Sequence, residues 1–151
     1  MALLHMQKTL QGYPPQPGLS CFTLSEVFVE TVADAAALGF ALARLPRGQR
    51  PVLWVQDRVS RKESGYPCIA GIGPLRPIIM VNVTRAADVL WTMEDGLRCR
   101  SLGGVIGEIW GDPAVLDFTA TKRLALRSEA AGVPCWLIRR LANPNLSAAR
   151  D

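Results

Sequence analysis

The sequence has few of the residues that build metal or catalytic sites. It contains one histidine, His5, and four cysteines that lie far apart without a Cys-x-x-Cys motif: Cys21, Cys68, Cys99 and Cys135. Tetrahedral zinc sites usually use paired ligands at short spacing, so no metal site is expected. Isolated cysteines of this kind are typical of small buried side chains in a reducing compartment. A catalytic triad is not expected either, because the single histidine lies among the first residues.

The sequence also lacks segments that would direct it to a membrane. Its N-terminus has no apolar core of a secretory signal, and no apolar run approaches the ~20 residues that a membrane span needs. Of the 151 residues, 49% are hydrophobic and 20% are charged, which is typical of one soluble globular domain. We therefore expect a cytoplasmic protein. The net charge of +4 is compatible with nucleic acid or an acidic protein as partner and identifies neither.

A phosphate-binding loop is missing where the chain pattern would place one. Residues 24–45 predict a strand, a turn and a helix, which is the arrangement that holds phosphate in P-loop proteins. The turn, residues 30–34, contains no glycine to wrap an anion and no Lys-Ser/Thr pair to reach phosphate and magnesium. Its two carboxylates, Glu30 and Asp34, would repel a triphosphate. The pattern therefore predicts the opening of a nucleotide-binding fold without the nucleotide site, and no cofactor.

The rest of the chain alternates between strand and helix patterns. Residues 1–20 contain a proline-rich stretch and are expected to form a flexible N-terminal arm. Residues 21–151 then predict one α/β domain with a mostly parallel sheet of about five strands and flanking helices. After the opening strand and a helix over 33–45, strands are expected over 52–56, 77–83, 102–109 and 133–139, helices over 85–98 and 113–131, and a long loop with at most one helical turn over 58–73.

Several blocks of the chain resemble the ImuA family. These blocks are LSEVF, VLWVQD, ADVLWTMEDGLRC, GGVIGEIWGD, LDFTATKRLAL and GVPCWLIRR, and the resemblance extends over residues 24–149. ImuA is a RecA-like accessory protein of DNA-damage-induced (SOS) mutagenesis in bacteria. The resemblance implies a RecA-like core of the P-loop NTPase type, with ImuB, an inactive relative of Y-family polymerases, and an error-prone DNA polymerase as partners.

The same resemblance assigns the remnants of a nucleotide site. The P-loop lysine and hydroxyl residue would fall at Ala35 and Ala36, so the groups that hold phosphate and magnesium are absent. The acid that activates water would fall at Asp57, and the Walker B acid at Glu108. Acids without the lysine predict a degenerate P-loop and no enzyme activity.

Four carboxylates are expected to gather at the carboxyl edge of the sheet, where open α/β sheets place their sites. They are Asp57, Glu108, Asp112 and Asp117. One interpretation is a remnant cluster that held Mg²⁺ or activated water. The alternative is that these acids cap helices and solvate loops.

Basic residues near the end of the chain are candidates for DNA contacts. Arg123 and Arg127 are spaced i,i+4 on one face of a predicted helix. In a RecA-like fold the loops after the later strands meet single-stranded DNA, so the resemblance adds Arg139 and Arg140. The alternative is a solvated basic face, and the tail lacks an aromatic residue for base stacking.

Trp91 is the aromatic residue most typical of an interface. The 100° step of a helix places it opposite the core residues of its own helix, beside Glu94, Asp95 and Arg98. An exposed tryptophan with adjacent charge is typical of an anchor for a protein partner. The alternative is that Trp91 packs under the long loop or the N-terminal arm.

We therefore expect a non-catalytic scaffold of the translesion synthesis complex that binds ImuB. RecA and single-stranded DNA are further candidate partners. After DNA damage the protein is expected at the nucleoid. The alternatives are an ATP-dependent DNA-binding protein with an atypical P-loop, and an inhibitor that mimics one RecA protomer. Relatives continue beyond the block that PNLSAARD resembles, so the chain is expected to be a shortened form or a short member that lacks a C-terminal partner-binding segment.

Overall fold

The computed structural model describes residues 23–32, 34–68 and 76–144. The expected N-terminal arm lies outside these residues. The chain forms five strands and four helices in the described part, in the order β1 (Leu24–Val29), α2 (Ala36–Arg44), β2 (Val52–Gln56), α3 (Arg58–Ser64), β3 (Ile78–Asn82), α5 (Ala86–Gly96), β4 (Gly104–Trp110), α6 (Phe118–Ala131) and β5 (Cys135–Arg140).

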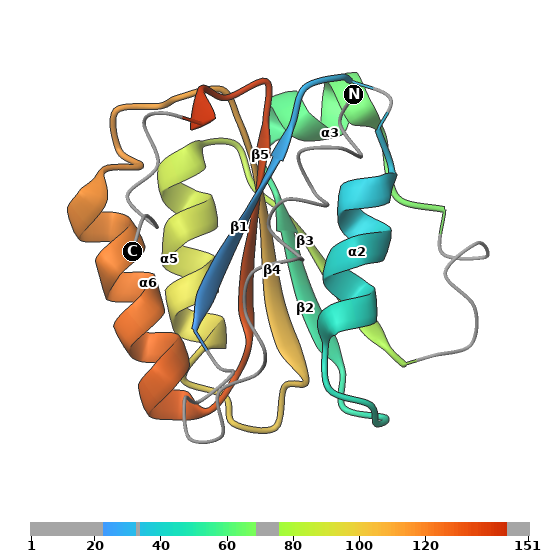
Figure 1. Cartoon of the computed structure of the whole chain (residues 1–151), viewed down its shortest axis with the longest axis vertical. Helices are drawn as coiled ribbons and strands as arrows, with labels where there is room; N and C mark the ends of the chain where they lie inside the picture. The colour runs from blue at the N-terminus through green and yellow to red at the C-terminus, as the bar shows by residue number, and fades with distance from the viewer. Residues whose placement is uncertain (1–22, 33, 69–75, 145–151) are drawn as a thin grey trace, which may run out of the picture.

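All five strands belong to one parallel sheet in the order β1-β5-β4-β2-β3 (Figure 1). β5 is the last strand in sequence but lies inside the sheet, where it pairs with both β1 and β4. The expected α/β class with a parallel sheet is confirmed. An all-parallel sheet with helices on both faces is consistent with a Rossmann-type or RecA-like layout.

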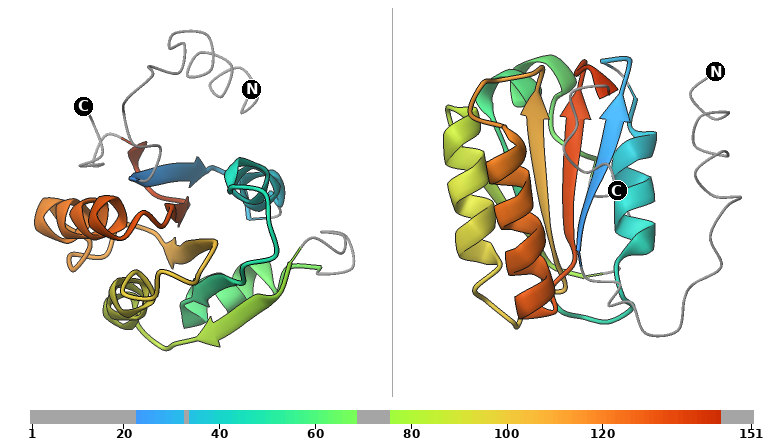
Figure 2. Two further views of the ribbon diagram at one scale, coloured as in Figure 1. Left: turned by 90° about the horizontal axis from the view of Figure 1, so that it is seen from below. Right: turned by 60° about the vertical axis from the view of Figure 1, so that its left-hand side comes forward.

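Helices cover both faces of the sheet. α5 and α6 lie side by side on one face, α2 covers the other, and α3 lies at the carboxyl edge of the strands (Figure 2). Strand β2, which lies between β4 and β3, is buried along its whole length, and its side chains alternate between the two layers. Leu53 and Val55 pack toward α5 and α6, whereas Val52 and Trp54 pack toward α2.

Two glycines have a structural role: one lets a helix approach the sheet closely, and the other ends a helix. Gly107 in β4 lies directly under Met93 of α5, so that a Cβ at this position would overlap the methionine sulfur. Gly132 has a φ of 65° and ends α6 in the left-handed conformation, which confirms the predicted end of that helix.

Side-chain caps at α3 and α6 account for two differences from the sequence expectation. Residues 58–73 were predicted as a long loop with at most one helical turn, but Asp57 Oδ1 accepts a hydrogen bond from Ser60 N at 2.6 Å and caps a seven-residue helix. α6 was predicted to begin at Pro113, but residues 113–116 form a turn. The helix begins at Phe118 because Asp117 Oδ1 accepts from Ala120 N at 2.8 Å. Side-chain caps determine where both helices begin, and the hydrophobic periodicity of the sequence does not reveal such caps.

Candidate functional site

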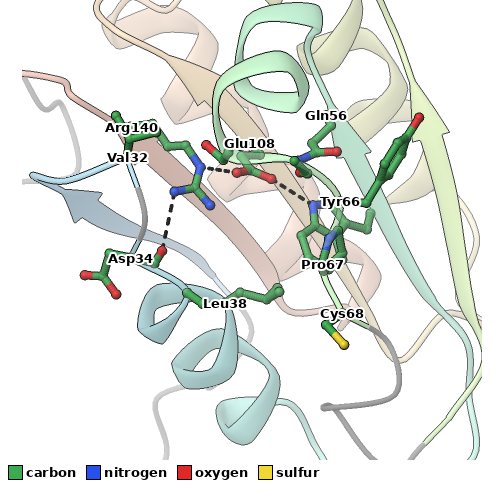
Figure 3. Close-up of a pocket in the computed structure, with 13 residues that line it drawn as sticks. Val32, Asp34, Leu38, Gln56, Tyr66, Pro67, Cys68, Glu108 and Arg140 are labelled. Atoms are coloured by element: carbon green, nitrogen blue, oxygen red, sulfur yellow. Dashed lines mark hydrogen bonds and ion pairs between the residues drawn. The ribbon is translucent and has the colours of Figure 1, made fainter.

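The candidate site lies at the carboxyl edge of the sheet, where the β1–α2 turn meets the ends of β2, β4 and β5 (Figure 3). A pocket of about 240 Å³ opens at this position. It is lined by side chains from the turn, from the strand ends and from the segment after α3: Val32, Asp34, Ala35, Leu38, Trp54, Gln56, Ser64, Gly65, Tyr66, Pro67, Cys68, Glu108 and Arg140. This is the crevice in which open α/β sheets bind ligands.

A buried ion pair forms the floor of this pocket. The Glu108 side chain in β4 is 0% exposed, and its Oε1 accepts a hydrogen bond from Arg140 Nε at the end of β5. The second carboxylate oxygen accepts from Trp54 Nε1 at 3.3 Å. Because both oxygens have donors from the protein, the charge of Glu108 is compensated inside the fold.

Arg140 also reaches the turn between β1 and α2. Its Nη1 lies 3.4 Å from the Asp34 carbonyl oxygen, while the Asp34 carboxylate points away from the guanidinium (Figure 3). That carboxylate instead accepts from Ala36 N at 2.7 Å through Oδ1, at the first residue of α2, which starts three residues later than predicted. An internal cation thus contacts the backbone of the turn between β1 and α2.

Ala35 and Ala36, the positions aligned with the P-loop lysine and hydroxyl residue, stand at the start of α2. Ala35 lines the pocket, and neither side chain has a polar atom to offer a ligand. Gln56 on the opposite wall is 1% exposed and donates through Nε2 to Gly65 O at 3.0 Å. Gln56 Oε1 and Ser64 Oγ, which also belong to the lining, are buried without a hydrogen-bond partner in the described part of the chain, so the polar lining is only partly engaged within the protein.

The four carboxylates of the predicted cluster do not act as one group. Both oxygens of Asp57 accept from backbone amides, of Ser60 at 2.6 Å and of Trp110 at 3.1 Å. Asp117 caps α6. Asp112 accepts from the Arg139 side chain at 2.7 Å. In the described part of the chain, no group of three or more His, Cys, Asp or Glu side chains is placed to hold a metal ion. The capping interpretation fits Asp57 and Asp117.

The structure argues against DNA contact by Arg139 and Arg140. Arg139 is 2% exposed and pairs with Glu26 at 3.2 Å and with Asp112, while its guanidinium lies 5.5 Å from the centre of the Phe28 ring. Arg140 is 6% exposed and pairs with Glu108. Phosphate contacts need accessible cations, so these two residues are corrected from DNA candidates to buried structural residues.

The remaining candidates come together on the outer surface of α5 and α6. Trp91 is 62% exposed, as the helical step predicted. Glu94 was expected beside it on the exposed face, but its side chain is only 12% exposed, because it lies between the helices and pairs with Arg123 and with Arg127, the latter at 3.2 Å. The proposed protein-binding and DNA-binding sets are therefore parts of one surface.

The other two members of the protein-binding set are open to solvent. Asp95 and Arg98 form an ion pair at 3.4 Å, and their side chains are 73% and 68% exposed. At the start of α5, Arg85 donates two hydrogen bonds to Asp88, at 2.9 and 3.0 Å, and these lower the pKa of that carboxyl. Both pairs link neighbouring turns of α5, so this helix carries its own charge compensation.

Comparison with known proteins identifies no family. No known family profile matches the sequence, and no characterised protein matches it at a significant level. Among solved structures, SulA from Pseudomonas aeruginosa is similar over 78% of this chain and 97% of its own length, with 15% sequence identity and a TM-score of 0.49. A likeness at this level assigns no function. Among the described residues, no helix is long and apolar enough to cross a bilayer.

Proposed function

We propose that the protein is a non-catalytic accessory factor of translesion DNA synthesis in the SOS response, acting in the cytoplasm and at the nucleoid through contacts with ImuB and its error-prone polymerase. RecA and single-stranded DNA are the secondary candidates for partners. The proposal starts from the resemblance of residues 24–149 to the ImuA family. The fold class is compatible with the RecA-like core that this resemblance implies.

The buried ion pair of Glu108 and Arg140 is the observation that supports a non-catalytic role. An acid that serves Mg²⁺ or water needs a free oxygen facing the ligand. Here both oxygens of Glu108 are engaged, by Arg140 and by Trp54. The alanines at positions 35 and 36 supply no phosphate or magnesium contact. From these two observations we infer that the site holds no nucleotide and that the fold supports protein contacts.

Thermal unfolding with and without Mg-ATP tests this part of the proposal. A ligand that binds only the native state at 100 times its Kd would add about 2.7 kcal/mol to the unfolding free energy. For a domain of this size that corresponds to a rise in Tm of roughly 5–10 °C. We expect no shift up to millimolar Mg-ATP, with an active RecA-type ATPase as the positive control.

A clear rise in Tm would favour the alternative, an ATP-dependent DNA-binding protein with an atypical phosphate site. The pocket of about 240 Å³ at the sheet edge is the feature that supports this alternative. The rise should then be lost in Glu108→Ala, provided that this variant folds by circular dichroism. ATP turnover by the purified protein would reject the non-catalytic proposal outright.

Co-purification with ImuB tests the scaffold role separately. The wild-type chain should retain ImuB on an affinity resin in the absence of nucleotide. Retention of RecA without any retention of ImuB would contradict the scaffold role and support an inhibitor that mimics a RecA protomer.

A further inference from the structure

The outer surface of α5 and α6 combines exposed apolar side chains with fixed cations. We call this the α5–α6 surface and define it by Trp91, Glu94, Arg123, Leu126 and Arg127. Trp91 is 62% exposed and Leu126 is 56% exposed. Tryptophan and arginine are the residue types that most often dominate the energy of protein interfaces.

Glu94 holds the two arginines in place. Its carboxylate accepts from Arg123 and pairs with Arg127 at 3.2 Å, and its side chain is 12% exposed. The arginine side chains remain 45% and 37% exposed, so both stay partly accessible to a partner while they are paired with Glu94. Binding a carboxylate there costs less side-chain entropy than fixing two free arginines would.

The charge on this surface is unevenly distributed. Between Lys122 and Arg127, α6 carries three cations and no carboxylate. Around Trp91, α5 carries three carboxylates, Asp88, Glu94 and Asp95, and each is paired with an arginine of α6 or at an end of α5. The excess positive charge therefore lies along α6, whereas the surface of α5 around the indole carries no excess positive charge.

This asymmetry disfavours single-stranded DNA as the occupant. A strand that stacks a base on Trp91 would bring its phosphates near the carboxylates of α5, whereas platforms for single strands combine aromatics with a continuous basic groove. A protein segment can place acidic residues over α6 and a basic residue near Asp95, whose side chain is 73% exposed.

We propose that the α5–α6 surface binds an amphipathic helix of a partner protein. This helix presents acidic residues at i and i+4, which match the i,i+4 spacing of Arg123 and Arg127, and apolar residues that pack on Trp91 and on Leu126. The proposal deepens the proposed scaffold function by naming the class of segment that the partner supplies.

Fluorescence anisotropy with labelled synthetic helices tests the surface directly. The probe is an amphipathic peptide with glutamates at i and i+4 along one side of a leucine stripe, and its counterpart carries lysines in their place. The full chain should bind the acidic peptide and not the basic one. Trp91→Ala should weaken binding by about 30-fold, the loss typical of a dominant interface residue.

The double variant Arg123→Ala, Arg127→Ala should weaken binding and reduce its dependence on salt. Its matched control is Arg47→Ala, Lys62→Ala, which removes the same charge from exposed positions elsewhere and should leave binding unchanged. Equal losses in both double variants would overturn the proposal, because they would indicate general electrostatic attraction. Unchanged binding in Trp91→Ala would also overturn it, as would tighter binding of a labelled oligo-dT through the same residues.

A parallel experiment with purified ImuB separates this inference from the proposed function. Binding of ImuB that is lost in Trp91→Ala supports both. If the acidic peptide binds as described and ImuB does not bind the wild-type chain, the surface stands and the proposed partner is wrong. If ImuB binds equally to wild type and Trp91→Ala, the partner stands and the surface is rejected.

Discussion

Breaking the buried pair at the carboxyl edge should be among the most destabilising single changes in the chain. Arg140→Met removes the guanidinium but leaves Glu108, 0% exposed, with Trp54 Nε1 as its side-chain donor. Removal of one partner of a buried ion pair costs about 3–5 kcal/mol, because the remaining charge is uncompensated. For a domain of this length the loss should lower Tm by roughly 6–20 °C.

The assay is urea unfolding followed by far-UV circular dichroism, with the slope m checked for constancy. Arg123→Met is the matched control, since it makes the same substitution in an ion-paired arginine whose side chain is 45% exposed. Exposed pairs contribute about 0–1 kcal/mol, so this variant should unfold close to wild type. The double variant Glu108→Leu, Arg140→Met removes both charges and should recover most of the lost stability.

Two results would refute this reasoning. If Arg140→Met costs no more than Arg123→Met, the Glu108 carboxylate is not held in a buried environment by Arg140. If the double variant is as unstable as the sum of its single changes, the two side chains do not interact energetically, and the ion pair is not what closes the site.

Three further results are expected. Asp57→Ala should cost about 2 kcal/mol in urea unfolding, more than the ~1 kcal/mol of Asp117→Ala, because Asp57 caps α3 and also accepts from a β4 amide; equal losses would contradict the second role. Gly107→Ala should destabilise by about 1–3 kcal/mol through overlap with Met93, and an unchanged midpoint would show that the helix can move away. Burial raises the pKa of the Cys135 thiol, so iodoacetamide should leave it unmodified in the native protein at pH 8 and label it only in urea, as peptide mass mapping would show.

The alternation of strand and helix patterns was enough to predict the fold class and every strand. The strand order was not predictable, because pairing between segments far apart leaves no local signal. α3 was missed because its sequence, RVSRKES, is polar and has little helical periodicity; the aspartate before it and Ser60 are the only local sign. Caps and turns of this kind depend on single hydrogen bonds.

The exposure of a candidate residue was predicted correctly where it depends on one helix. It was predicted wrongly where it depends on contacts between several strands. The exposure of Trp91 follows from the 100° step within α5. The burial of Arg139 and Arg140 depends on carboxylates from β1 and β4, which only the tertiary fold brings near them. Charged residues are almost never fully buried unless they are paired, so their position at a strand end suggested exposure. The sequence signal that could have indicated this burial was the pair of consecutive arginines at the end of an apolar strand.

The position of β5 between β1 and β4 bears on how the protein is made. Of the described strands, β1 is the first to be synthesised and β5 is the last, and β1 has β5 as its pairing partner. Until then β1 and β4 both have open edges, which can pair with other chains. Folding is therefore expected to be largely post-translational, and a premature stop before Cys135 would leave the three-stranded sheet β4-β2-β3 and a β1 without its pairing partner, instead of a slightly shortened domain.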